Sequence, residues 1–108
     1  METVLFELVE RGRDVATRAG RGTLAAVGRQ VLDTVACVAS GGSHPLATRW
    51  VPLLPRGGDA VSLAAGGDLD LVTAVAADAT LSHVDEFDPL HAAAAVAPGA
   101  VVVPAALA

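Results

Sequence analysis

The sequence predicts an all-α fold, in which residues 1–108 form one small helical bundle unit. Two observations favour helices: apolar residues recur at spacings of three and four in several segments, and glycines and prolines separate those segments. A third observation is the composition, with 53% hydrophobic but only 3% aromatic residues. Apolar surface made of Ala, Val and Leu suits closely packed helices, so we expect a compact unit with a modest core.

The first two helices are predicted from amphipathic patterns. Residues 3–19 place apolar side chains on one face and most charged side chains elsewhere. That face comprises Val4, Leu5, Leu8 and Val15. Gly20 and Gly22 end this pattern, and Thr23 is suited to cap a second helix that stops at residues 40–42. The apolar stripe of the second helix comprises Leu24, Val27, Val31, Val35 and Val38.

The middle of the chain is interrupted by prolines and glycine pairs. Only residues 46–54 are expected to form a helical turn or two, and the glycine pairs at 57–58 and 66–67 are interpreted as turns. Asp68 or Asp70 is predicted to cap a helix that runs to about His83. One side of that helix would carry Leu69, Val72, Ala76, Ala79 and His83.

The last part of the chain is predicted to contain a loop and then a helix. Pro89 disfavours the helical conformation at Asp88, so a loop is expected to begin within residues 85–89. Residues 100–108 resemble the opening of a buried helix. The chain shows no internal repeat and no solvated linker, which favours a single domain.

Charge and cysteine content exclude several classes of function. The net charge is −5 and the seven basic residues, all arginines, are scattered, so we expect no nucleic acid partner. Residues 92–108 are uncharged but too short and too weakly apolar for a membrane span. Acidic residues among the first ten argue against an export signal, and Cys37 is the only cysteine. We therefore expect a cytoplasmic protein without disulfides, with Cys37 as a small buried hydrophobe.

Three segments, taken in order, resemble one known family. Residues 32–41 (LDTVACVASG) are similar to a family stretch LDTLGCALAG, and residues 77–83 (ADATLSH) to ANGTLAH. Residues 84–91 (VDEFDPLH) follow where the family has ALDFDDTH, and residues 97–108 (APGAVVVPAALA) are similar to HPGAVVVPAALA. The chain thus resembles the amino-terminal helical domain of MmgE/PrpD proteins, which include 2-methylcitrate dehydratase. The resemblance implies a single incomplete domain, because full-length members are several times longer.

The family acts on small di- and tricarboxylic acids by dehydration, decarboxylation or isomerisation, without a metal or organic cofactor. Such chemistry requires a positioned base, an acid for the leaving group and groups that hold carboxylates. On the resemblance, Glu86, Asp88 and His91 are the candidate catalytic residues, with Glu86 as a possible proton acceptor. The family's threonine falls on Leu90 and its catalytic histidine on Ala97, neither of which can donate a hydrogen bond from its side chain. Alone, the polypeptide is expected to be inactive in this chemistry.

Acidic and histidine side chains around the predicted loop also form a potential metal cluster. It comprises His83, Asp85, Glu86, Asp88 and His91, and imidazoles with carboxylates bind zinc. Their spacing matches no recognised ligand pattern, and the resembled family needs no metal. We therefore favour a polar, partly solvated loop and expect neither a metal nor a cofactor.

Two functional hypotheses follow. In the first, the chain is a subunit of a split MmgE/PrpD-like lyase or isomerase that acts on a small carboxylic acid once a second polypeptide supplies the rest of the fold. In the second, it is a non-catalytic helical binding or regulatory module that forms a homo-oligomer. Exposed apolar surface favours a partner in both, and the altered threonine and histidine positions favour the second.

Overall fold

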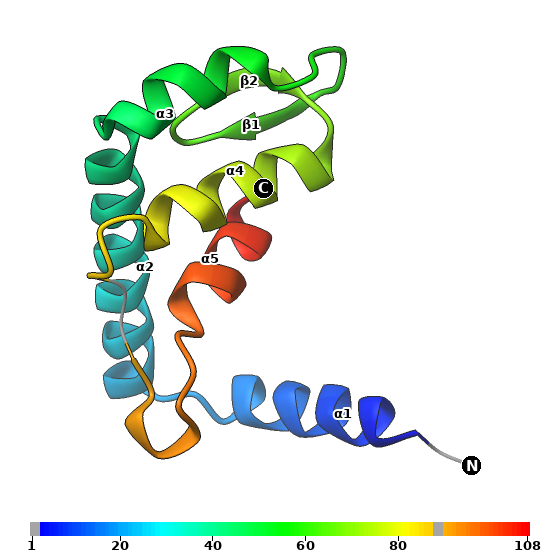
Figure 1. Ribbon diagram of the computed structural model, residues 1–108. Helices are drawn as coiled ribbons and strands as arrows, with labels where there is room; N and C mark the ends of the chain where they lie inside the picture. The colour runs from blue at the N-terminus through cyan, green and yellow to red at the C-terminus, as the bar shows by residue number, and fades with distance from the viewer. Residues whose placement is uncertain (1–2, 88–89) are drawn as a thin grey trace.

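The computed structural model describes residues 3–87 and 90–108. The protein is mostly helical, with 67% helix, and adds a small two-stranded sheet that the all-α prediction did not include (Figure 1). The helical prediction is thus confirmed in its coarse form. The α-helices are α1 (Val4–Thr17), α2 (Arg21–Gly42), α3 (Pro45–Trp50), α4 (Leu71–His83) and α5 (Gly99–Leu107). The strands are β1 (Ala60–Ser62) and β2 (Gly66–Leu69), and two 3-10 helices are η1 (Val51–Leu53) and η2 (Ala92–Ala94).

Three helices form the body of the protein. The helix α4 packs against both α2 and α5, and α5 also contacts α2 (Figure 1). The hairpin of β1 and β2 lies alongside α4, on which its residues contact Ala74, Asp78 and Leu81 (Figure 1). The helix α1 leaves the amino-terminal end of α2 and extends away from the body, and none of its residues is buried.

The close packing of α2 on α4 depends on a glycine. A Cβ atom added to Gly41 would lie 2.8 Å from both the carbonyl carbon of Leu81 and Cγ1 of Val84, and closer still to the Leu81 carbonyl oxygen. Such distances are far below ordinary van der Waals contact. The glycine that was predicted to end the second helix therefore also allows the two helices to touch through their backbones.

The core is small, as the composition predicted. One cluster joins three helices through Val38, Ala47 and Leu81, with Trp50 packed against it. A second cluster joins the hairpin to α4 through Ala60, Leu69 and Ala74. Cys37, which precedes Val38 on α2, is buried, as expected for a small hydrophobic residue.

Several predicted helix boundaries are confirmed and one is wrong. Asp70 caps α4, since its carboxylate accepts a 3.0 Å hydrogen bond from the Thr73 N–H, and the helix ends at His83 as predicted. The second helix begins at Arg21 after Gly20, and not after Thr23. Gly22 therefore lies in the first turn of the helix instead of breaking it.

Burial along α2 also differs from the prediction. Thr34 is buried although it is polar, and its hydroxyl donates to the Gln30 carbonyl oxygen at 3.0 Å. This bond to its own helix satisfies the hydroxyl and offsets the cost of burial. Asp33 is exposed. In the predicted apolar stripe Val38 is buried, whereas Leu24 and Val27 remain exposed because no element covers them.

Candidate functional site

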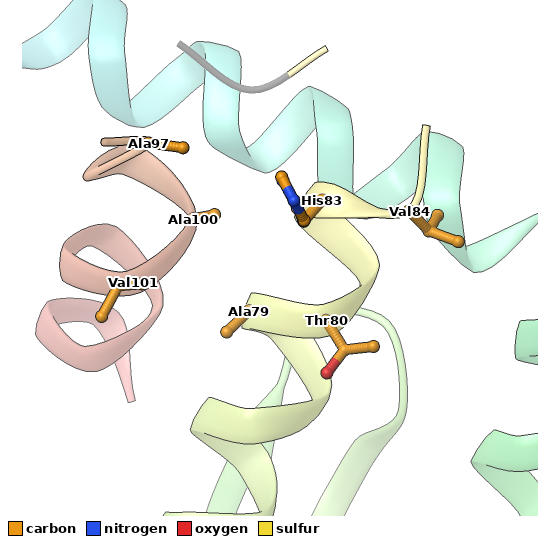
Figure 2. A pocket seen from close by; sticks show the side chains of 7 residues that line it. All are labelled: Ala79, Thr80, His83, Val84, Ala97, Ala100 and Val101. Carbon is orange, nitrogen blue, oxygen red and sulfur yellow. The ribbon is translucent and has the colours of Figure 1, made fainter. Parts of the chain in front are cut away.

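A cavity lies at the junction of α4 and α5, next to the loop that carries the predicted site residues. It has a volume of about 540 Å³. The helix α4 ends at His83 and α5 begins at Gly99, so the two helix ends place their side chains on opposite walls. The lining comprises Ala79, Thr80, His83 and Val84 on the α4 side, and Ala97, Ala100 and Val101 on the α5 side (Figure 2).

The lining of this cavity is apolar except for Thr80 and His83. Figure 2 shows the His83 ring on the side of α4 where Ala97 and Ala100 lie, whereas Thr80 points away from α5. On the resemblance, Ala97 occupies the position of the family's catalytic histidine. Ala97 presents only a methyl group to this wall of the cavity.

A second cavity of about 410 Å³ lies on the other side of α4, against α3 and η1. It shares Thr80 and Val84 with the first cavity, so the two cavities adjoin across these two residues, and we call them together the α4 groove. The other residues that line the second cavity are Leu46, Ala47, Arg49, Trp50, Leu53 and Leu81. Leu46, Leu53 and Val101 are exposed along this groove. The groove thus offers apolar side chains and few polar ones.

Glu86 lies outside the first cavity, in the turn that follows α4. Its backbone has a φ of 53°, a conformation that non-glycine residues adopt infrequently. Its N–H donates to the His83 carbonyl oxygen at 3.0 Å, which closes the end of the helix. The side chain is exposed to solvent. Glu86 is therefore held by its backbone. Among the described residues, its carboxylate has no hydrogen bond or ion pair.

His91 has a structural role in the loop before α5. Its Nδ1 accepts a 3.2 Å hydrogen bond from the Ala94 N–H and caps η2. Its own N–H donates to the Val96 carbonyl oxygen at 2.8 Å. The side chain is exposed and does not line the first cavity. Asp88, the third predicted site residue, lies outside the described residues.

The structure does not bring Glu86 and His91 into the cavity beside His83. Both side chains are exposed. That they face a composite site formed with a second polypeptide remains a prediction. Asp85 instead ties the loop to α2, since its carboxylate accepts a 2.7 Å hydrogen bond from the Ser40 hydroxyl. Within residues 3–87 and 90–108, no group of three His, Cys, Asp or Glu side chains could hold a metal ion.

The sequence alone did not point to the residues that line the α4 groove. Ala79, Ala100 and Val101 are small apolar residues in alanine-rich helices, and the same residue types fill the core. No pattern in one sequence separates an alanine on a groove from an alanine in the core. His83 is the exception, because the sequence placed it at the end of this helix and among the residues of the potential metal cluster.

Comparison with known proteins finds no matching family model, no matching curated protein and no matching solved structure. The resemblance to the MmgE/PrpD family therefore rests on the three sequence segments alone. None of the helices in the described part of the chain has both the length and the apolar character needed to cross a membrane.

Proposed function

We propose that this chain is a non-catalytic helical interaction module, whose α4 groove receives an apolar segment of another polypeptide. The observation that carries the proposal is the groove itself, made of two adjoining cavities whose lining is almost entirely apolar. Exposed apolar patches of this kind mark protein interaction sites in soluble domains. An amphipathic helix that lays its apolar face in a groove is a common form of such recognition.

The polar residues of the site agree better with binding than with catalysis. A general base must come within hydrogen-bond reach of the proton that it removes. Among the described residues, His83 is the one ionisable side chain that lines the first cavity, whereas Glu86 and His91 lie outside it. The described residues of the cavity therefore do not include the pair of acid and base groups that the resembled chemistry requires.

The mass and composition of the protein, purified under native conditions from its own cells, test this proposal. Light scattering after size exclusion should show an assembly with a different polypeptide, larger than the 10.8 kDa chain. Val101→Asp places a charge in the groove and should remove that polypeptide, because a carboxylate is costly to bury against apolar side chains. The matched control is Val61→Asp, since Val61 is 60% exposed and Val101 65%, and Val61 lies outside the groove.

Retention of the same polypeptide by Val101→Asp would overturn the assignment of the groove. So would a wild-type chain that carries no second polypeptide under these conditions. Circular dichroism of both variants separates loss of binding from loss of fold.

A split lyase is the second candidate, and one placement favours it. Ala97 and His83 line opposite walls of one cavity, so the position that the resemblance assigns to a catalytic histidine lies beside an imidazole. A second polypeptide could complete this site for a small carboxylic acid, and the residues that the resemblance assigns to it are Glu86, Asp88 and His91. Glu86→Gln should then lower turnover by the assembled complex by about tenfold or more, the lower range for loss of a general base. Unchanged turnover would exclude that role for Glu86.

A further inference from the structure

The protein exposes more surface than a compact chain of its size. Its accessible area is 7446 Å², whereas a folded monomer of 10.8 kDa exposes about 5,500 Å², so roughly 1,900 Å² is in excess. Its radius of gyration is 15.5 Å, against about 13 Å for a compact domain of this length. A standard interface covers about 800 Å² on each partner, so the excess is large enough for an extensive pairing of two chains.

The helix α1 has no buried residue, and its apolar face has no covering element in the described chain. Leu5, Leu8 and Val15 lie on that face and each is at least half exposed. An isolated helix of this length is marginally stable in water, and the two ion pairs within α1 are exposed and contribute little. The helix therefore needs a surface to pack against.

A surface of matching length exists on the first half of α2. No residue between Arg21 and Asp33 is buried, and Leu24, Val27 and Val31 lie along one face of this segment. The segment is about 20 Å long, and the 14 residues of α1 span about 21 Å. We call this face, with the adjoining Val102 of α5, the α2 stripe.

The α2 stripe also carries an unsatisfied polar group. A cavity of about 230 Å³ lies between α2 and α5, lined by Val27, Gln30, Val31 and Val102 among others. The Gln30 Nε2 is buried there and has no hydrogen-bond partner among the described residues. A buried donor without a partner is costly, so this part of α2 is incompletely satisfied in the single chain.

Charge favours pairing of like chains through α1. Residues 4–18 carry three acidic side chains and three arginines, so the net charge of −5 lies on the rest of the chain. Two copies that met directly through their acidic bodies would repel each other. A neutral helix placed on the α2 stripe avoids that repulsion.

We propose that a second copy of this chain covers the α2 stripe with its α1 helix, and that the exchange is reciprocal. In the structure α1 runs away from the α2 of its own chain (Figure 1). A two-fold axis would place each α1 on the other copy, so that two stripes and two helix faces are covered at once. This surface is distinct from the α4 groove, which stays open in the pair.

Light scattering with two matched variants tests the exchange. The wild type, produced without any second polypeptide, should have twice the 10.8 kDa mass, and Leu8→Asp should reduce it to one chain, because it places a carboxylate in the interface. The control is Phe6→Asp, on the same helix but off the apolar face, since Phe6 is 53% exposed and Leu8 61%. Phe6→Asp should remain a dimer, so equal loss in both variants would overturn the proposal.

A mixing experiment tests reciprocity. Val27→Asp should also be monomeric, because it damages the stripe instead of the helix. In a mixture of Leu8→Asp and Val27→Asp, one of the two reciprocal contacts is intact, so a heterodimer weaker than the wild-type dimer should form.

Absence of that heterodimer, or a Leu8→Asp protein that dimerises like the wild type, would overturn the exchange. A wild-type monomer at tens of micromolar concentration would overturn it as well, as expected if α1 folds back on its own stripe. None of these results bears on Val101→Asp, so this inference and the role of the α4 groove fail separately.

Discussion

Asp78 of α4 accepts a 2.6 Å hydrogen bond from the Ser62 hydroxyl, and both side chains are buried. The same carboxylate accepts the backbone N–H groups of Leu63, at 2.9 Å, and Ala64, at 3.3 Å. The Ser62 oxygen in turn accepts the Ala65 N–H at 2.9 Å. One carboxylate on the helix therefore satisfies the donors of the turn between β1 and β2 and holds the hairpin on α4.

Asp78→Ala should destabilise the protein by about 3 kcal/mol, because it leaves the buried Ser62 hydroxyl and the part-buried N–H groups of Leu63 and Ala64 without their acceptor. Urea unfolding followed by circular dichroism measures this change. Asp59→Ala is a suitable control, since Asp59 is exposed and lies beside the same hairpin. A loss of less than about 1 kcal/mol for Asp78→Ala would show that water replaces the carboxylate at the turn.

Ser62 and Asp78 should be energetically coupled. Ser62→Ala alone should cost about 1 kcal/mol or more, because it removes both a donor to Asp78 and an acceptor for the turn. The double variant should cost less than the sum of the single changes, by roughly 1 kcal/mol. Unfolding free energies of the four proteins complete this cycle, and strict additivity would show that the 2.6 Å contact contributes no coupling.

The hairpin explains why the fold could be predicted only in part. The helices follow from apolar spacing and from signals such as Asp70 and the glycines after residue 40, which act within a few residues. The strands have three and four residues, too short to show an alternating pattern. Their pairing depends on Asp78, sixteen residues after Ser62, and such a distant contact is not visible in local sequence.

The candidate site was predictable to a smaller extent. The sequence indicated a loop after His83, and the structure confirms that α4 ends there. It did not predict that the His91 ring nitrogen would cap η2, or that the Glu86 backbone would adopt a positive φ, because both depend on the path of the loop. The α4 groove arises from packing between helices, which a single sequence does not define.

The cap of α4 should make stability depend on pH. Hydrogen bonds from the Thr73 hydroxyl, and then from its N–H, hold the pKa of Asp70 below its ordinary value of 3.8. A depressed pKa in the folded state means that ionised Asp70 contributes stability above pH 3.8, which is lost as pH falls through the folded pKa.

Asp70→Asn keeps a capping side chain that does not titrate. The advantage of the wild type over this variant should therefore shrink between about pH 5 and pH 2. Thermal unfolding across that range measures the difference, and Asp59→Asn corrects for the change in net charge. An advantage that is constant with pH would contradict the proposed linkage.

Two glycines of α2 should respond to alanine with opposite signs. At Gly41 a Cβ would lie within 2.8 Å of the Leu81 carbonyl carbon, so α4 must move away and Gly41→Ala should cost about 3 kcal/mol. At Gly28 nothing lies within 4 Å, so Gly28→Ala should stabilise by about 0.5–1 kcal/mol through helix propensity. Urea unfolding of both variants measures the two effects in one helix. A Gly41→Ala protein as stable as the wild type would mean that α2 and α4 can separate at little cost. The buried contact between Val38 and Leu81 would then contribute little to the stability of the fold.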